Sequence, residues 1–203
     1  MKIAIQKKGH LRDESILFLN SLGITCLQNK NQLITKCPKT NIEIVFLRDD
    51  DIPNYVNNNL IDFGIIGEDV ISENNNQTKV VKKLGFSKCQ LVMASPKDSK
   101  IKNINNLQNK TIATSYPNIL KKFLKQNKIQ STIITVSGSV EVAPRLNLSD
   151  AVCDLTQTGN TLRECGLKQF ATVFKSEAVL IQSQSKNQEK QNFLDLIKQY
   201  ANS

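Results

Sequence analysis

Short apolar runs alternate with amphipathic stretches along most of the chain. The apolar runs predict strands at residues 1–5, 32–35, 42–47, 60–66, 89–95, 111–115, 129–136, 151–155, 170–174 and 178–181. Apolar side chains at helical spacing predict helices at residues 13–22, 119–124 and 193–200, and further helices are expected to begin near Pro53, Gly67 and Gly159. This alternation of strands and helices favours an α/β fold with mixed, mostly parallel sheets.

The net charge of +9 narrows the candidate partners without choosing among them. A strongly basic chain usually binds nucleic acid, a membrane surface or small polyanions. The lysines are spread through residues 79–88, 97–110 and 121–128, without interleaved aromatic residues and without a nucleic-acid-binding motif. A solvated basic surface is therefore favoured over a nucleic-acid interface.

Length and cysteine usage indicate a reduced, globular protein. A chain of 203 residues suits one large or two small domains and buries a core without disulfide bonds. The cysteines are Cys26, Cys37, Cys89, Cys153 and Cys165. Their number is odd and no C-x-x-C pair occurs, so we expect reduced thiols and no zinc site. The single histidine, His10, cannot build a metal site alone. With no apolar run of membrane-spanning length and no signal-peptide core, a cytoplasmic location is expected.

The most informative stretch runs from a predicted strand into a loop and a helix. The apolar run 151–155 carries Asp154 near its end, and a loop with Thr158, Gly159 and Thr161 follows. Gly159 lets the backbone approach a ligand, the threonine hydroxyls donate to phosphate oxygens, and the first helical turn offers free N–H groups. Asp154 is placed to accept hydrogen bonds from a sugar. The alternative is an ordinary polar turn in which Asp154 caps the next helix.

Four other places carry candidate chemistry, each with a structural alternative. Lys8, Gly9 and His10 form a basic loop between a strand and a helix, a plausible anion site that is also common in α/β proteins. Arg48 follows a strand and either contacts a ligand or pairs with Asp49 or Asp51, the latter also a candidate cap for the helix entered through Pro53.

Asp69 and Tyr116 each open a predicted helix. Asp69 is either a nucleoside contact or a carboxylate that stabilises the helix dipole, while Gly67 before it allows close approach to the backbone. Tyr116 either faces a nucleotide or packs in the core.

The signature residues fall at fixed spacings over about thirty positions. They are Glu141, Val142, Ala143, Pro144, Arg145, Ser149, Val152, Asp154, Leu155, Thr158, Gly159, Thr161 and Leu162. This pattern resembles the signature of ATP phosphoribosyltransferase, the first enzyme of histidine biosynthesis. The stretches 48–53 (R-D-D-D-I-P), 62–69 (D-F-G-I-I-G-E-D) and 112–117 (I-A-T-S-Y-P) resemble further motifs of that family, so the resemblance extends from Ile3 to Ile181.

The chain departs from the family pattern at three places. His10 stands where the family has Arg after Lys-Gly, and Asn31-Gln32 stand where it has another Arg. A neutral imidazole offers no charged fork to pyrophosphate, so this substitution is expected to weaken catalysis. Asn147 replaces a family Gly, a mild change because Asn tolerates a left-handed backbone.

The resemblance implies a fold and a reaction. The fold is that of type II periplasmic binding proteins, with a ligand cleft between two lobes. The first lobe would comprise residues 1–88 with 176–203, and the second, residues 89–175, would carry the phosphoribosyl pyrophosphate loop. The reaction condenses ATP with 5-phosphoribosyl 1-pyrophosphate, giving 1-(5-phosphoribosyl)-ATP and pyrophosphate, with Mg²⁺ bound to the substrate and no metal held by the protein itself.

The resemblance also implies roles for individual residues. The catalytic residues would be Asp154 and Arg48. Phosphoribosyl pyrophosphate would be bound by Glu141, Asp154, Thr156, Thr158, Gly159, Asn160, Thr161 and Leu162. ATP and pyrophosphate would be bound by Lys8, Gly9, His10, Asp69 and Tyr116.

Partners follow from the same resemblance. Long-form members carry an additional C-terminal domain that binds histidine, and short-form members use a regulatory subunit related to histidyl-tRNA synthetase. We expect this chain to stop before such a domain, but its motifs L-R-D-D-D-I-P and T-S-Y-P look more like the catalytic half of long-form members, so a truncated enzyme without a partner stays an alternative. A homodimer is expected and such a subunit is a candidate partner, with neither nucleic acid nor membrane as partner. Two alternatives stay open: a weakened or inactive relative that binds the ligands without turnover, and a nucleic-acid-binding protein whose affinity falls steeply with salt.

Overall fold

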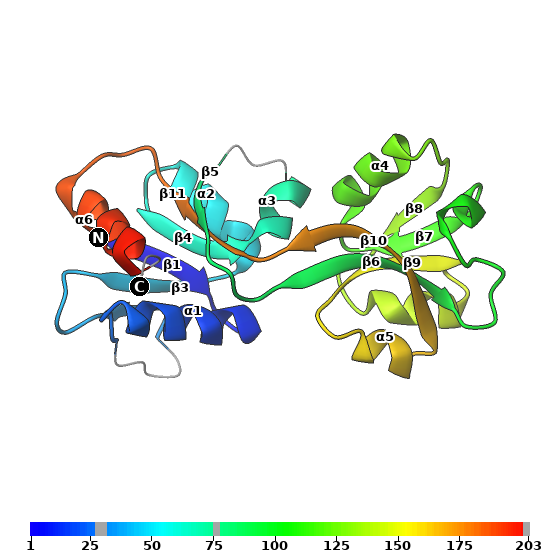
Figure 1. The fold of residues 1–203 in the computed structure, drawn as a ribbon, viewed down its shortest axis with the longest axis horizontal. Coiled ribbons are helices and arrows are strands. Elements are labelled where there is room, and N and C mark those ends of the chain that lie inside the picture. Colours follow the sequence, from blue (N-terminus) through cyan, green and yellow to red (C-terminus); the bar gives the residue numbers. More distant parts are fainter. Residues whose placement is uncertain (27–31, 75–77, 201–203) are drawn as a thin grey trace. The chain divides into compact units, whose positions relative to one another are not determined.

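The computed structural model describes residues 1–26, 32–74 and 78–200, and Figure 1 shows its ribbon. The chain divides into two compact units. Unit 1 consists of Met1–Ile71, Asn75–Ser87 and Glu177–Ser203, and unit 2 of Ser72–Asn74 and Lys88–Ser176. Each unit contains its own sheet, flanked by helices.

Unit 1 is built on a six-stranded sheet of order β2-β3-β1-β4-β11-β5. Its strands are β1 (Lys2–Gln6), β2 (Ile34–Lys36), β3 (Glu43–Leu47), β4 (Phe63–Gly67), β5 (Lys79–Lys83) and β11 (Ala178–Gln182). Its helices are α1 (His10–Ser21), η1 (Asp49–Asp51), α2 (Ile52–Asn57), α3 (Glu68–Asn74), which ends in unit 2, and α6 (Gln188–Tyr200). β1 pairs in parallel with β3 and β4, so these three strands end at one edge of the sheet.

Alternation along the strands of unit 1 fills a core on each face of the sheet. Ile3 and Ile5 of β1 join a cluster with Leu19 of α1 and Phe193 of α6, whereas Ala4 joins one with Ile52 of α2. Successive strand residues point to opposite faces, so both faces need helices to exclude water. The sheet is thus a buried central layer.

Unit 2 is built on a five-stranded sheet of order β10-β6-β9-β7-β8. Its strands are β6 (Cys89–Pro96), β7 (Thr111–Thr114), β8 (Thr132–Thr135), β9 (Ala151–Thr156) and β10 (Leu167–Ser176). Its helices are η2 (Ile104–Leu107), α4 (Pro117–Gln126), η3 (Val140–Leu146) and α5 (Asn160–Glu164). β7 pairs in parallel with β8 and β9, and β6 is antiparallel to β9 and β10.

The two faces of this second sheet are covered by different elements. Cys153 of β9 joins the cluster that holds Leu120 and Leu124 of α4. Val152 joins the cluster that holds Val140 of η3 and Leu162 of α5. Strand alternation therefore directs Asp154 and Thr156, two and four residues beyond Val152, toward the face of η3 and α5.

The predicted mixed α/β fold is confirmed, with fewer parallel pairs than expected. Four of the nine strand pairings among the described residues are parallel, β1–β3, β1–β4, β7–β8 and β7–β9. The antiparallel pairs arise where β6, β10 and β11 join the sheets. β11 begins two residues after β10 ends, and it pairs antiparallel with both β4 and β5.

One expectation about the cysteines is wrong. Cys26 and Cys37 are joined by a disulfide bond, with their Cα atoms 4.3 Å apart, while Cys89, Cys153 and Cys165 are free. Both disulfide cysteines pack on the α1 side of the unit 1 sheet. They are eleven positions apart in sequence, and this spacing carried no signal of the pairing.

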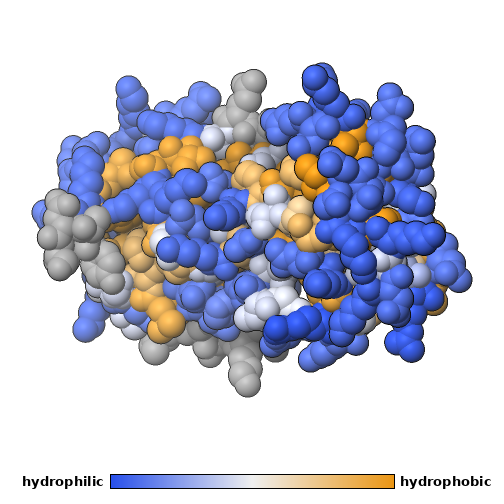
Figure 2. Space-filling view, turned by 45° about the vertical axis from the view of Figure 1, so that its right-hand side comes forward, coloured by the Kyte–Doolittle hydropathy of each residue, from blue (hydrophilic) through white to orange (hydrophobic). Residues whose placement is uncertain are grey.

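Polar residues cover most of the face shown in the space-filling view, and apolar residues are exposed in separate patches (Figure 2). The most exposed large apolar side chains include Leu17, Leu60 and Leu146. Over the described ranges, each helix is too short or too polar to span a bilayer.

Candidate functional site

The first group of candidate residues lies at the edge of unit 2 where β9, β7 and β8 end. These strands run in parallel, so the loops after them emerge on the same side of the sheet. Ligands of open α/β sheets usually bind at such carboxyl ends. Asp154 and Thr156 are the last polar residues of β9, and the loop to α5 follows directly.

Asp154 is a partly buried carboxylate at this edge. One of its oxygens, Oδ1, accepts a hydrogen bond from the Leu155 N–H at 2.8 Å. Burial raises the pKa of Asp154 above its ordinary value, the hydrogen bond from Leu155 acts in the opposite direction, and the nearby charge of Glu141 raises the pKa further. Asp154 does not cap α5, whose N-cap is Gly159. That alternative interpretation of Asp154 is wrong.

The loop between β9 and α5 is held by its own threonines. Thr156 Oγ1 accepts from the Gly159 N–H at 2.7 Å, and Thr158 Oγ1 accepts from the Asn160 N–H at 3.4 Å. Gly159 has φ 75°, in the left-handed region that favours glycine. The sequence therefore fixes a tight turn at the place where the resemblance predicts the phosphate loop.

The first turn of α5 presents polar groups to solvent on one side and a core residue on the other. Thr158, Asn160 and Thr161 are exposed. Arg163 donates a hydrogen bond to Asn160 Oδ1. Leu162 is 4% exposed and packs in the core on the η3 side. Any contact of Leu162 with a ligand is therefore limited to its backbone.

Glu141 approaches the same edge from η3. This helix begins after Ser139 and ends before Asn147, both in the left-handed region, with φ 50° and 58°. The expectation that Asn147 tolerates a left-handed backbone is confirmed. Because η3 and Asp154 share one face of the sheet, the two carboxylates are neighbours, and the charge of Glu141 raises the pKa of Asp154.

The second group of candidates lies where β1, β3 and β4 end in unit 1. The Lys7 N–H donates to the Leu47 carbonyl oxygen at 2.7 Å and ties the loop after β1 to the end of β3. Lys8, Gly9, His10 and Arg48 follow these strand ends and are all exposed. The topology thus brings together residues that are about forty positions apart in sequence.

Gly9 and His10 form the entry to α1. Gly9 is the N-cap, with φ 95°, and no side chain caps the helix. The first-turn N–H groups therefore face outward without helical acceptors, an arrangement suited to an anion. The His10 imidazole Nε2 lies 3.6 Å from Glu14 Oε1, one turn along α1, and the imidazole remains mostly exposed.

Arg48 is available to a ligand. Among the described residues, no carboxylate lies within ion-pair distance of its guanidinium, so the alternative of a pair with Asp49 or Asp51 is wrong. Asp49 instead accepts from the Gln6 side chain at 3.3 Å. Asp51 occupies the predicted N-cap position of α2, followed by Pro53, but it makes no side-chain capping bond.

Asp69 lies deeper than a surface ligand contact, at 5% exposure. Its carboxylate folds back over Gly67, and a Cβ atom at Gly67 would collide with it. The glycine is needed for this contact within the chain. The expectation that Gly67 opens the backbone to a ligand is therefore corrected, and the position of Asp69 in the first turn of α3 fits the dipole alternative.

Tyr116 belongs to unit 2 and is the N-cap of α4. It packs against the core cluster on the α4 side of the sheet, and its N–H donates to Thr114 Oγ1 at 2.9 Å. This packing fits the core alternative.

Sequence reasoning overlooked one cation at the unit 1 edge. Arg12, in the first turn of α1, places its guanidinium 5.7 Å from the centre of the Phe46 ring near the end of β3 and pairs with Asp13 at 2.6 Å. Its position two residues after His10 was the available signal. The predicted replacement of the second family arginine at Asn31 lies outside the described residues, and Gln32 is exposed.

The described ranges hold no group of three or more His, Cys, Asp or Glu side chains that could bind a metal ion. Carboxylate oxygens suited to a hard cation are nevertheless present at the unit 2 edge, on Asp154 and Glu141.

Sequence comparisons find close relatives of known name. The profile of the HisG family, ATP phosphoribosyltransferase, matches residues 48–202. An ATP phosphoribosyltransferase of Parabacteroides distasonis is 42% identical over 195 residues, covering 96% of this chain and 69% of that protein. That of Cytophaga hutchinsonii is also 42% identical, covering 96% and 68%.

Structural comparisons agree. A chain of the ATP phosphoribosyl transferase (HisG:HisZ) complex from Thermotoga maritima matches with a TM-score of 0.81 and 26% identity, over 98% of this chain and 97% of that one. A substrate-binding protein of an amino acid ABC transporter matches with a TM-score of 0.60 and 12% identity, over 98% and 90%. The second likeness concerns the fold alone, and it confirms the predicted type II periplasmic-binding-protein fold.

The profile match spans most of the chain, and the relatives exceed 40% identity over nearly all of it. The profile also includes the stretch that forms β9, its threonine loop and α5. This protein therefore belongs to the ATP phosphoribosyltransferase family.

Proposed function

We propose that this chain condenses ATP with 5-phosphoribosyl 1-pyrophosphate, forming 1-(5-phosphoribosyl)-ATP and pyrophosphate in the first step of histidine biosynthesis. Family membership supports the activity. The observation that carries it in the structure is the threonine-braced loop beside Asp154 at the end of β9.

In unit 2, this edge would hold the ribose 5-phosphate. The Asp154 carboxylate would accept hydrogen bonds from ribose hydroxyls, with Glu141 bordering the site. The hydroxyls of Thr158 and Thr161 and the first-turn N–H groups of Thr161 and Leu162 would donate to the phosphate. The bond from Gly159 to Thr156 Oγ1 holds the turn before the ligand arrives, which lowers the entropy lost on binding.

In unit 1, the exposed cations would hold the phosphates of ATP and the departing pyrophosphate. Lys8 and Arg48 follow adjacent parallel strands, and the N-terminus of α1 lies at the same edge. Arg12 adds a guanidinium in that turn. Asp69 and Tyr116 remain proposals for the nucleotide, although their packing favours structural roles.

The chemistry needs positioning and charge stabilisation rather than a protein nucleophile. Adenine N1 would attack the anomeric carbon while the bond to pyrophosphate breaks. Substrate-bound Mg²⁺ would neutralise charge on the pyrophosphate. The protein's part is to orient the ribose through Asp154 and to stabilise the leaving anion through Arg48 and Lys8.

A regulatory subunit is the proposed partner. The similar chain from Thermotoga maritima was solved in a HisG:HisZ complex, which supports a comparable assembly here. A homodimer stays a prediction from the family resemblance.

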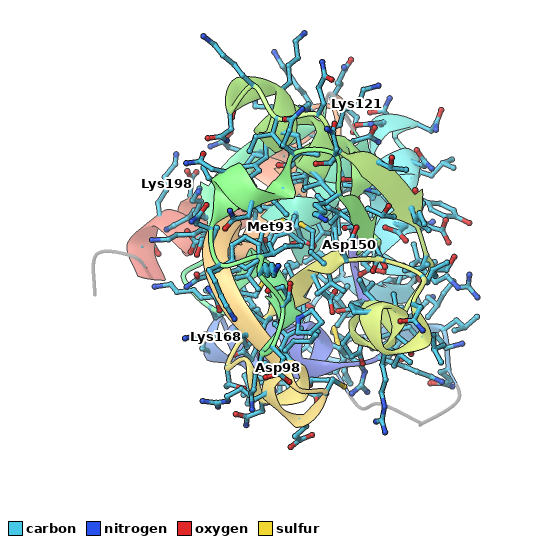
Figure 3. All side chains as sticks on the ribbon, turned by 90° about the vertical axis from the view of Figure 1, so that its right-hand side faces the viewer. Met93, Asp98, Lys121, Asp150, Lys168 and Lys198 are labelled. Atoms are coloured by element: carbon cyan, nitrogen blue, oxygen red, sulfur yellow. A yellow bond between two sulfur atoms is a disulfide. The ribbon has the colours of Figure 1, made fainter. Side chains whose placement is uncertain are left out.

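The test is turnover by the purified chain with ATP, phosphoribosyl pyrophosphate and Mg²⁺, followed by formation of phosphoribosyl-ATP. Asp154→Ala should lower the rate by at least about a hundredfold. Asp98→Ala is the matched control, because Asp98 is an exposed carboxylate of the same unit in the turn after β6 (Figure 3).

Equal rates in the wild type and both variants would refute the role of Asp154. If the wild type forms no product with or without the regulatory subunit, yet binds both substrates, the weakened relative becomes the better description.

A further inference from the structure

A groove in unit 2 lies beside the free edge of β8, on the face covered by α4. Its volume is about 870 Å³, and it is lined by Pro117, Asn118, Lys121, Leu124, Lys125, Lys128, Ile129, Gln130, Ser131, Ile133 and Thr135. None of these is among the residues proposed above for substrate binding. The groove has an apolar floor and a basic rim.

The rim is unusually one-sided in charge. Lys121, Lys125 and Lys128 are four and three residues apart, so they lie on one side of α4 and of the turn after it, and all three are exposed. Within the described residues, none of the three ammonium groups has an acidic partner. The segment from Ser99 to Val140 contains seven lysines and no Asp or Glu.

A carboxylate from outside that segment does reach one lining residue. Glu73 of α3 accepts from the backbone N–H groups of Asn118 and Ile119, at 2.8 and 2.9 Å. Its two oxygens are therefore committed to the N-terminus of α4. The three lysines remain available.

The backbone of β8 is also available. β8 is the last strand of its sheet and pairs only with β7 among the described residues. The N–H groups of Thr132 and Val136 donate to the carbonyls of Lys110 and Thr114. Backbone groups of a strand alternate in direction, so those of Ile133 and Thr135 point to the open edge.

Side chains of the same strand line the groove. Ile133 and Thr135 of β8 and Ser131 just before it occupy alternate positions, and the lining includes all three. A chain that paired with β8 would therefore place every second side chain over this apolar floor, within reach of the lysines. The methylene groups of glutamate would cover Ile133 while its carboxylate met an ammonium group.

From these contacts we propose that the β8 edge and the α4 lysines form a docking site for an extended, acidic segment of another protein, which adds a strand to the sheet. Unpaired edge strands recruit partners in this way, through backbone hydrogen bonds for affinity and alternate side chains for specificity. A second copy of this chain is a poor occupant, because pairing β8 with β8 would bring two sets of lysines together. The acidic stretch of this chain, Asp49–Asp51, is a 3₁₀ helix and not an extended strand.

The probe is a fluorescent peptide of about eight residues, a common strand length, with alternating Glu and Thr. Its anisotropy is measured as the full-length protein is added at low salt. Two control peptides replace every Glu by Gln, or carry N-methyl groups on alternate amides so that they cannot pair as a strand. Binding should be strongest for the unmodified acidic peptide and should weaken as salt is added.

Two charge-matched double variants locate the site. Lys121→Glu with Lys125→Glu should weaken binding by about tenfold. Lys168→Glu with Lys175→Glu makes the same change of charge on β10, the opposite edge strand of the sheet. This variant should change the affinity for the peptide by less than about twofold. Figure 3 shows Lys121 beside α4 and Lys168 beside β10. All four lysines are exposed, so neither variant should disturb folding.

Three results would overturn the proposal. Equal binding of the N-methylated peptide would exclude strand pairing, and equal losses in the two double variants would indicate general attraction between opposite charges. Competition on equal terms by polyuridylate RNA would indicate a site for any polyanion.

Discussion

Asp154 holds a carboxylate where burial disfavours its charge, next to a second carboxylate on Glu141. The free-energy cost of ionising Asp154 is consistent with a site that gains further hydrogen bonds when a sugar is bound. Functional groups often lie in such unfavourable surroundings, since the scaffold supplies the stability.

The raised pKa of Asp154 predicts a pH-dependent gain in stability for Asp154→Asn. The folded-state pKa lies above the unfolded value, so this carboxyl group favours folding when protonated, and that contribution is lost as pH rises through the folded-state pKa. The variant cannot ionise. Its free energy of unfolding relative to the wild type should therefore increase from about pH 4, near the ordinary carboxyl pKa, toward neutrality.

Urea unfolding of both proteins at several pH values measures this difference. A difference that stays constant with pH would show that Asp154 is no harder to ionise in the folded state. Asp98→Asn, at an exposed site, serves as the control.

His10 stands at the edge of unit 1 where β1, β3 and β4 end, at a position where the family resemblance predicts an arginine. The imidazole is exposed at the start of α1, so an arginine fits there without displacing a core residue. His10→Arg should raise kcat/KM for phosphoribosyl pyrophosphate about fivefold, the effect of one added charged contact worth ~1 kcal/mol. Asn57→Arg adds the same charge at the exposed end of α2 and should leave the rate unchanged. An unaltered rate in His10→Arg would show that the missing charge does not limit catalysis.

Residue roles could be predicted from sequence where they depend on local backbone conformation, and not where they depend on tertiary packing of the side chain. The left-handed backbones of Gly159, in the loop from β9 to α5, and of Asn147 followed from preferences that act locally. Leu162 and Gly67 did not, because a core contact and a carboxylate folding back over its neighbour depend on tertiary packing.

At the scale of elements, the shorter of the two hydrogen bonds that hold the loop from β9 to α5 is accepted by the Thr156 hydroxyl. Thr156→Val removes the acceptor of the Gly159 N–H while keeping the side chain's shape. We expect kcat/KM for phosphoribosyl pyrophosphate to fall about tenfold and stability to fall by about 1 kcal/mol.

Thr156→Ser retains the hydroxyl and should restore most of the activity, which a purely steric role of the threonine methyl would not allow. Steady-state kinetics of the two variants, together with urea unfolding, separate these outcomes. Equal loss in both variants would contradict the role of the hydrogen bond.

The elements missed by sequence analysis are those with weak apolar patterns. β5 reads K-V-V-K-K and is largely exposed at the edge of its sheet, where lysines are common and alternation is lost. η3 includes Pro144, a residue that disfavours the interior of a helix, yet Val140 and Ala143 bury it against β9. β1, β4 and β9 were predicted because both faces are buried, which leaves a continuous apolar run.

At the scale of the whole molecule, the sequence of unit 2 is inserted into that of unit 1, so the last segment of unit 1 follows unit 2 along the chain. β11 lies between β4 and β5 in the unit 1 sheet, although it follows β10 of unit 2 in sequence. The same late segment supplies α6, whose Phe193 contacts Phe63 with ring centres 4.8 Å apart. Unit 1 therefore depends on two segments distant in sequence, whereas nearly all of unit 2 is continuous.

This difference predicts opposite fates for two fragments. Residues 88–176 contain every strand of the unit 2 sheet and should fold alone, with some loss of stability because Glu73 no longer caps α4. Residues 1–87 lack β11 and α6, which leaves β5 without its partner and exposes Ile65 and Phe63, so this fragment should remain unfolded. Dispersion of amide signals in NMR spectra distinguishes the folded from the unfolded state.

Joining residues 177–203 to the 1–87 fragment through a flexible linker should restore folding. The entropy lost in closing the linker is small compared with the free energy gained when β11 and α6 bury apolar surface. A folded 1–87 fragment would mean that β1, β3 and β4 with α1 and α2 suffice for the core of unit 1.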